Sequence, residues 1–162
     1  MSIVEYTVQS TAIRERLEKD FSDETPELQG LLKIVLTFAP EFFQDVQGIS
    51  FRVFFTQKPL QDHAAYCKLL PKAIRFKLKT DFFVIIDKAG FDESNRIDKA
   101  KLIIHELHHI GRDEEGQPEI RKHNEKEDFC ELPHHDLFSE RVVQKLKERL
   151  DQPQLEGEKE TA

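Results

Sequence analysis

The sequence predicts an α+β fold, in which helices at both ends of the chain enclose a small sheet of three or four strands. Three observations lead to this prediction. Apolar residues recur with helical spacing near both ends, they follow strand-like patterns in the middle, and another helical pattern comes directly after the last strand. A chain of 162 residues can bury a sizeable core as one domain. We expect a single domain over residues 1–150 and a disordered acidic tail over residues 151–162.

The helices expected at the two ends have apolar stripes of helical period. The first is expected at Thr11–Lys19, and the second at Glu27–Phe38, where a polar turn ending in Pro26 precedes it as a cap. The last helix is expected to begin at Asp136 or Ser139 and to end at Leu150.

The middle of the chain contains three expected strands. Ile49–Thr56 begins with alternating apolar and polar residues, and Ala73–Lys79 alternates strictly, which indicates one solvated face. Asp81–Asp87 holds a continuous apolar run, which is typical of a central strand buried on both faces.

Composition and charge argue against several classes of function. The formal net charge of −7 disfavours a general binder of nucleic acid or of membrane surfaces. We find no apolar run of membrane-spanning length and no signal-peptide pattern at the start. Cys67 and Cys130 are isolated, so we expect free thiols in a reduced chain that is located in the cytoplasm.

The most informative segment is His105-Glu-Leu-His-His109, which has the H-E-x-x-H pattern of zinc hydrolases. It lies in an expected helix, Asn95–Gly111, for which Ser94 or Asn95 is a cap and Gly111 a stop. Residues four apart share a helix face, so His105 and His109 can bind one metal ion. One broad side of this helix is apolar and consists of Ile97, Ala100, Ile103, Ile104, Leu107 and Ile110.

An apolar back and a histidine-bearing front are typical of the active-site helix of a metalloprotease. Together with the order of elements, they predict a minimal zincin-like domain, in which the sheet packs on the H-E-x-x-H helix. In such an arrangement an edge strand commonly lines the cleft and pairs with an extended peptide. The expected strand around Ile74–Lys79 is a candidate for that edge.

The two helical histidines leave a catalytic zinc ion one protein ligand short, because such sites use three ligands and a water. Downstream residues with suitable side chains are His123, Glu125, Glu127, Asp128, Glu131, His134, His135, Asp136 and Glu140. We favour His123, because a turn at Gly116–Pro118 lets the chain double back toward the helix.

The segment Ile104–Ile110, followed by Arg121–His123 and then by Asp128 and Phe129, resembles the phage metallopeptidase family. These are small zincin-like proteins of phages and prokaryotes, and the spacing to His123 is also similar to that of SprT-like metallopeptidases. The resemblance implies that His105, His109 and His123 bind zinc and that Glu106 is the general base.

Four more residues are candidates for supporting the metal or an oxyanion: His108, Asp128, His134 and His135. The alternatives are a surface or core role for His108, and exposed histidines beside a helix-capping Asp136. Tyr66 and Arg121 are further candidates for a contact to the oxyanion.

These features predict a zinc-dependent metallopeptidase that acts on peptide or protein substrates, with Glu106 as the base that takes a proton from the attacking water. The alternative is a non-catalytic, zinc-stabilised binding or regulatory protein, which would not need Glu106. A third alternative, a nucleic-acid-associated protein, rests on the basic stretch Lys68–Lys79. We prefer to explain that stretch as the solvated face of an edge strand, where charges oppose aggregation.

Overall fold

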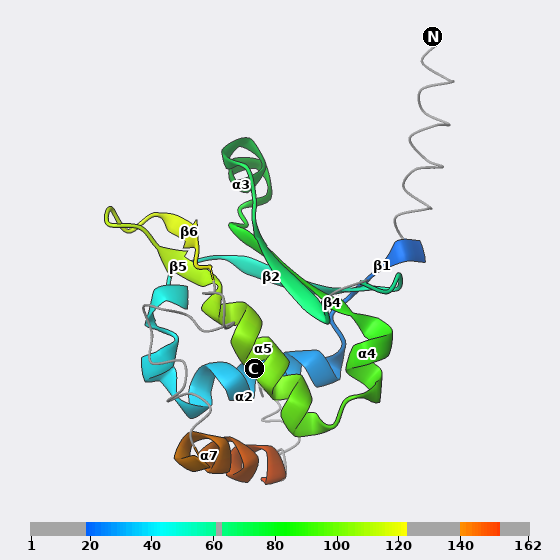
Figure 1. Ribbon diagram of the computed structural model, residues 1–162. Coiled ribbons are helices and arrows are strands. Elements are labelled where there is room, and N and C mark those ends of the chain that lie inside the picture. The colour runs from blue at the N-terminus through cyan, green and yellow to red at the C-terminus, as the bar shows by residue number, and fades with distance from the viewer. Residues whose placement is uncertain (1–18, 61–62, 123–139, 153–162) are drawn as a thin grey trace, which may run out of the picture.

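A mixed four-stranded sheet forms the centre of the computed structural model, which describes residues 19–60, 63–122 and 140–152 (Figure 1). Its strands are β1 (Phe21–Asp23), β2 (Phe51–Thr56), β3 (Ala65–Leu69) and β4 (Phe82–Asp87), in the order β1-β2-β4-β3. β2 and β4 are parallel, whereas β1 and β3 pair antiparallel with their neighbours. The apolar run of β4 therefore lies at an inner position, as its composition predicted.

Three helices pack on one another on one side of this sheet, and the last of them lies farthest from the strands (Figure 1). They are α2 (Pro26–Phe38), α5 (Arg96–His108) and α7 (Glu140–Asp151), and the short α4 (Lys88–Glu93) links β4 to α5. Alternate residues of the inner strands meet the apolar stripes of the helices in one core. Its buried members include Leu28, Leu31, Val53, Phe55, Val84, Ile86, Ile103, Ile104, Leu107 and Leu146. The predicted α+β fold class, with its sheet packed on the motif helix, is confirmed.

The local signals at the ends of α2 agree with its observed bounds. Thr25 accepts a hydrogen bond from Leu28 N through Oγ1, at 3.3 Å, and Pro26 occupies the first turn, where no amide donor is needed. Two short 3-10 helices follow α2, namely η1 (Pro40–Phe42) and η2 (Gln44–Val46). The second of these contacts the segment that follows α5.

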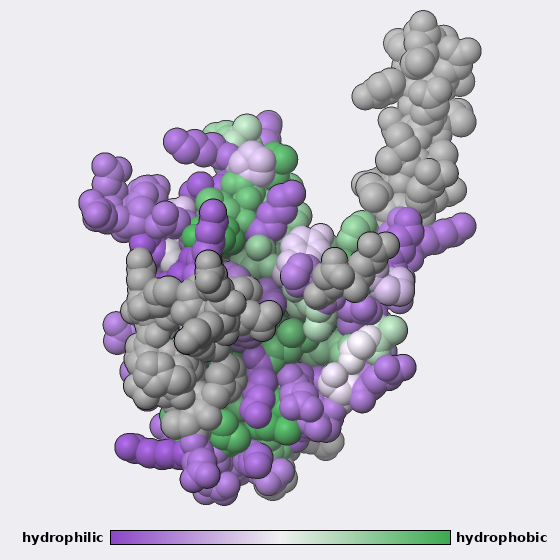
Figure 2. Space-filling view, viewed as in Figure 1, coloured by the Kyte–Doolittle hydropathy of each residue, from purple (hydrophilic) through white to green (hydrophobic). Residues whose placement is uncertain are grey.

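The segment predicted as the strand Ala73–Lys79 is instead a helix, α3 (Lys72–Leu78), and that prediction is wrong. Pro71 accepts the first helical bonds, and Lys79 ends the helix with a positive φ of 51°. The edge of β4 that this segment would need is occupied by β3, which the sequence did not lead us to expect. α3 therefore rises beside the sheet, and Figure 2 shows apolar and hydrophilic side chains next to each other over it.

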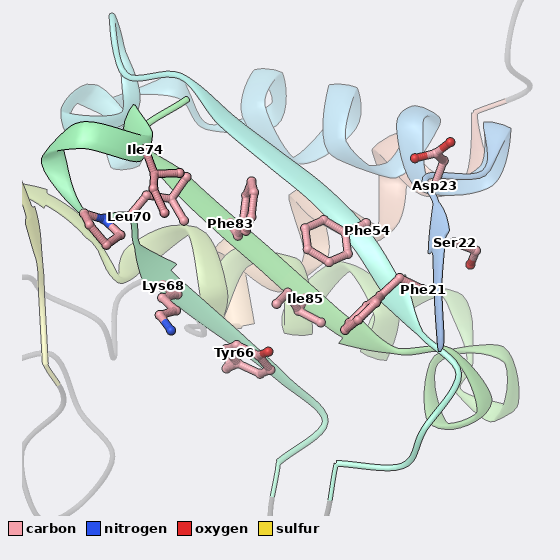
Figure 3. Close-up of a pocket in the computed structure, with 11 residues that line it drawn as sticks. Phe21, Ser22, Asp23, Phe54, Tyr66, Lys68, Leu70, Ile74, Phe83 and Ile85 are labelled. Carbon is pink, nitrogen blue, oxygen red and sulfur yellow. The ribbon is translucent and has the colours of Figure 1, made fainter. Parts of the chain in front are cut away.

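The sheet face opposite the helices forms an open apolar groove (Figure 3). Phe21, Phe54 and Phe83 cross three strands as a row of edge-to-face rings, with centroids 5.7 and 5.1 Å apart. Tyr66 and Lys68 of β3 point into the same groove. β4 is therefore covered by helices on one face only. On the groove face Ile85 is still only 6% exposed, so the expected burial on both faces holds there and fails at the partly exposed Phe83.

The motif helix was predicted with nearly its observed bounds, except at its end. α5 ends at His108 instead of Gly111, because His109 N donates to Glu106 O at 3.1 Å and the next residues form a strand. That strand, β5 (Ile110–Arg112), pairs with β6 (Pro118–Ile120) in a separate hairpin.

The remaining predictions divide between the described residues and those outside them. The helix at the C-terminal end is confirmed from Glu140 onward, as is the strand that begins near Ile49. The helix expected at Thr11–Lys19 and the acidic tail lie almost wholly outside the described residues, so the single domain over residues 1–150 stays a prediction. No helix among the described residues is long and apolar enough to cross a membrane.

Candidate metal centre

The orientation of α5 is set at its first turn and along its buried back. Asn95 caps the helix by accepting from Asp98 N at 2.9 Å, while its amide donates to the Asp98 carboxylate at 2.9 Å. Ala100, Ile103 and Leu107 are almost fully buried against the core. These contacts fix the rotation of the helix, and the opposite side therefore carries His105 and His109, both partly exposed.

The side chains of His105, Glu106 and His109 converge at the end of this helix. Their ligand-type atoms all lie within 4.8 Å of one another, which is a spacing that one metal ion can bridge. The two imidazole rings have centroids 5.3 Å apart and planes inclined by 80°. Imidazole nitrogen and carboxylate oxygen are donors that zinc accepts.

His109 is held by the chain that returns to it after the hairpin. Its Nδ1 lies 2.7 Å from the Arg121 carbonyl, and Arg121 N donates to the His109 carbonyl at 2.7 Å. A proton on Nδ1 donates to the Arg121 carbonyl and leaves the Nε2 lone pair for a metal ion. Metal-binding histidines usually donate their second ring nitrogen in this way.

The hairpin turn brings this carbonyl into place. Gly116 has φ 80°, a conformation that suits glycine, and the Asp113 carboxylate accepts from the amides of Glu115 and Gln117 at 2.9 and 2.8 Å. A turn is therefore present near the expected position, but it spans Asp113–Gly116 because Pro118 already belongs to β6. It returns the chain to His109.

Two arginines of the hairpin anchor it to the η2 segment. Arg121 donates through Nη1 to the His108 carbonyl at 3.0 Å and through Nη2 to the Asp45 carboxylate. Arg112 donates to the Gln47 carbonyl. Because its guanidinium is bound in these contacts, Arg121 positions the end of α5, and the structure does not support it as an oxyanion contact.

Tyr66 was another oxyanion candidate, and this prediction is wrong. Successive strand residues point to opposite faces, so Tyr66 projects into the open groove while its neighbours Ala65 and Cys67 face α5 (Figure 3). The sequence analysis did not foresee that Cys67 lies at the site. Burial, followed by the charge of Glu106, raises the pKa of the Cys67 thiol to about 12.

Glu106 is the most strongly perturbed group of the cluster. Its side chain belongs to a residue that is only 4% exposed, and burial raises its pKa from 4.5 to about 7. Among the described residues, no group forms a hydrogen bond with its Oε2 atom. An unpaired carboxylate oxygen in the interior is costly. The position therefore fits a bound cation or an ordered water at this site.

The pKa of Glu106 predicts how the stability of the metal-free protein depends on pH. Below pH 4.5 the carboxyl is protonated in both the folded and the unfolded chain, whereas above pH 4.5 the unfolded chain loses this proton first. Because the pKa of Glu106 is raised from 4.5 to about 7 in the folded chain, the free energy of unfolding should fall by about 3 kcal/mol as the pH rises from 4.5 to above 7.

Urea unfolding of the metal-free wild type and of Glu106→Gln at pH 5 and pH 8 checks this expectation. Gln stays neutral at both pH values. The free energy of unfolding of the variant minus that of the wild type should therefore be about 2–3 kcal/mol larger at pH 8 than at pH 5. Glu119→Gln, at an exposed position of β6, is the control and should show no such change. A stability difference between Glu106→Gln and wild type that is independent of pH would contradict the shifted pKa.

His108 points to the other side of α5. It is 1% exposed, its Nδ1 lies 2.7 Å from the Ile104 carbonyl, and its ring packs on Phe43 at a centroid distance of 5.1 Å. This is the setting of a core histidine, which was one of the two alternatives for this residue. A role for His108 at the metal stays a prediction.

The other predicted site residues, His123, Asp128, His134 and His135, lie outside the described residues, as does Cys130. The described range 63–122 ends at Lys122, directly after the residue that holds His109. Sequence reasoning missed the carbonyl of Arg121, because a backbone acceptor has no residue-type signal.

Comparison with known proteins identifies the family to which this combination of helix, hairpin and sheet corresponds. A family described as "Putative phage metallopeptidase" matches residues 19–154, which include every described element. No curated protein and no solved structure matches the chain. Since the match covers most of the sequence, the chain belongs to the phage metallopeptidase family.

Proposed function

We propose that this chain is a zinc-dependent metallopeptidase that hydrolyses peptide bonds with Glu106 as the general base. The observation that carries the proposal is the convergence of two imidazoles with a buried carboxylate that has an unpaired oxygen. A structural histidine pair would not require a carboxylate at this position. Family membership supports a metallopeptidase in general, and the geometry supports the specific roles.

The proposed zinc ligands are His105, His109 and His123. The first two are supported by their spacing on α5 and by the hydrogen bond that orients His109. His123 is supported by its position two residues after Arg121, whose backbone binds His109 in both directions. The described chain is thereby anchored beside His109 at Arg121, two residues before His123 in the sequence.

Zinc held by these residues would supply a Lewis acid that lowers the pKa of water from 15.7 toward 7. Glu106 would accept the proton of the attacking water and pass it to the leaving amine. Its buried position suits this task, because a pKa of about 7 lets the carboxyl both accept and release a proton near neutral pH.

The surroundings of the site favour an extended peptide as substrate. The edge strand beside α5 is β3, and not the segment Ile74–Lys79 that the sequence predicted for this position. One side of β3 pairs with β4, and its other side forms the edge of the sheet. An extended peptide can add to such an edge through main-chain hydrogen bonds. This pairing would bring a scissile bond past the end of α5.

Hydrolysis of unfolded protein tests the proposal. The full chain, loaded with one equivalent of zinc, is incubated at pH 7.5 with a denatured, fluorophore-labelled protein and with a mixed peptide library. We expect cleavage that a chelator stops and added zinc restores. Stoichiometric zinc binding without cleavage of either substrate would favour the non-catalytic binding protein instead. Absence of zinc binding would contradict both the metallopeptidase and the zinc-stabilised binding protein.

A further inference from the structure

α3 and the residues next to it form a basic projection on an acidic chain. Residues 68–79 contain five basic side chains and no acidic one, whereas the whole chain has a net charge of −7. The explanation for an edge strand applies only to Lys68 of β3, because residues 72–78 are helical. The other basic residues therefore need another explanation.

Most of these charges have no acidic partner. Arg75 pairs with Asp81 at 3.1 Å. Within the described ranges, no carboxylate lies within 4.0 Å of Lys68, Lys72, Lys77 or Lys79. Asp81, Asp113 and Glu115 line a shared cavity with Lys72 and Phe76, but none of them pairs with a lysine of this segment. Four lysines close together in sequence therefore leave a local excess of positive charge that a polyanion would neutralise.

Aromatic and apolar side chains are exposed between these lysines. Phe76 on α3 is 82% exposed, and Ile74 is 44% exposed. Ile74 and Lys68 also line the open groove of the sheet, so the basic projection continues into the row of phenylalanines (Figure 3). Exposed large apolar residues of this kind mark interaction sites.

We propose that the two cation–ring pairs of this projection bind single-stranded nucleic acid. Tyr66 and Lys68 form one pair in the groove, and Lys72 and Phe76 form the other on the side of α3 that faces the hairpin. The lysines would contact phosphates, and the aromatic rings would stack on bases. Each nucleotide carries one phosphate and one flat base, which matches cations and rings placed next to each other. An anionic membrane fits less well, because the groove beneath α3 is concave and a flat bilayer cannot enter it.

This surface is separate from the candidate metal centre. Tyr66 and Lys68 point to the open face of β3, whereas Cys67 faces α5 and Glu106 on the other side of the sheet. The inference therefore does not depend on the proposed peptidase activity, and its test needs no metal.

Fluorescence anisotropy with a labelled 20-nucleotide oligo-dT tests the inference on the full chain. We expect binding at low salt that weakens as salt rises. Lys72→Glu/Lys77→Glu should weaken binding at least tenfold and make the log–log salt slope shallower by about 1.4, since each phosphate contact on a single strand contributes about 0.7. Phe76→Ala, at an exposed position, should weaken binding about five- to tenfold through lost stacking.

The control is Lys145→Glu/Lys147→Glu, which makes the same change in net charge at exposed positions of α7. It should bind the oligonucleotide like the wild type. An equal loss in this control, or an unchanged affinity in Lys72→Glu/Lys77→Glu, would overturn the proposal. So would Phe76-dependent binding to phosphatidylserine vesicles without binding to the oligonucleotide. Equally strong competition by poly-glutamate, with no effect of Phe76→Ala, would show a general polyanion surface and would also overturn it.

Discussion

Glu106→Gln should lower peptide hydrolysis by about 10²–10⁴-fold and leave the zinc content unchanged. Gln has nearly the same shape as Glu and fits the same buried position, but it cannot take a proton from water. The two proposed histidine ligands on α5 are not altered, so metal binding should persist. Loss of activity with retained metal is the signature of a missing general base.

The measurement combines zinc content with the initial rate of cleavage of a peptide found in the library screen. Glu119→Gln serves as the matched control, because it makes the same chemical change at an exposed position outside the cluster. It should retain the wild-type rate. A Glu106→Gln protein with full activity would remove Glu106 from the mechanism, whereas loss of zinc in this variant would make the carboxylate a ligand.

Replacing His105 or His109 by Ala should weaken zinc binding by about 10³-fold or more, because each change removes one of three proposed ligands. Zinc that binds only the folded chain raises its stability by mass action. The increase in Tm on adding zinc should therefore disappear in both variants. His123→Ala should behave in the same way if His123 is the third ligand.

Zinc content after dialysis and the zinc-dependent change in Tm distinguish the outcomes. His63→Ala is the control, since His63 is exposed and lies outside the cluster. Stoichiometric zinc in His123→Ala would assign the third ligand to Asp128 or to His134–Asp136. Stoichiometric zinc in His105→Ala or His109→Ala would contradict the proposed centre itself.

The features that the sequence predicted correctly are set by residues close to one another in the chain. The cap at Asn95, the apolar back of α5 and the spacing of His105 and His109 all follow from the period of a helix. The apolar run of β4 and the turn at Gly116 depend equally on local residue types. Local chemistry was sufficient to locate this part of the candidate site.

The strand predicted at Ala73–Lys79 failed because its pattern was judged without its competitor. Ile74, Phe76 and Leu78 alternate as in a strand, but the edge of β4 accepts only one partner, and Ala65–Leu69 occupies it. The excluded segment satisfies its backbone as a helix after Pro71. Whether an alternating segment becomes a strand depends on which distant segment pairs with the sheet edge, and the alternation itself carries no information about that pairing.

By itself, the sequence determined the α+β class, the motif helix and the residue types that make up the candidate metal centre on it, because these follow from helical and strand periods. Only the tertiary structure decided the environment of those residues. The core that surrounds Glu106 raises its pKa to about 7, and the returning hairpin brings the Arg121 carbonyl to His109. Burial and long-range hydrogen bonds depend on residues far apart in the chain, and no local pattern specifies them.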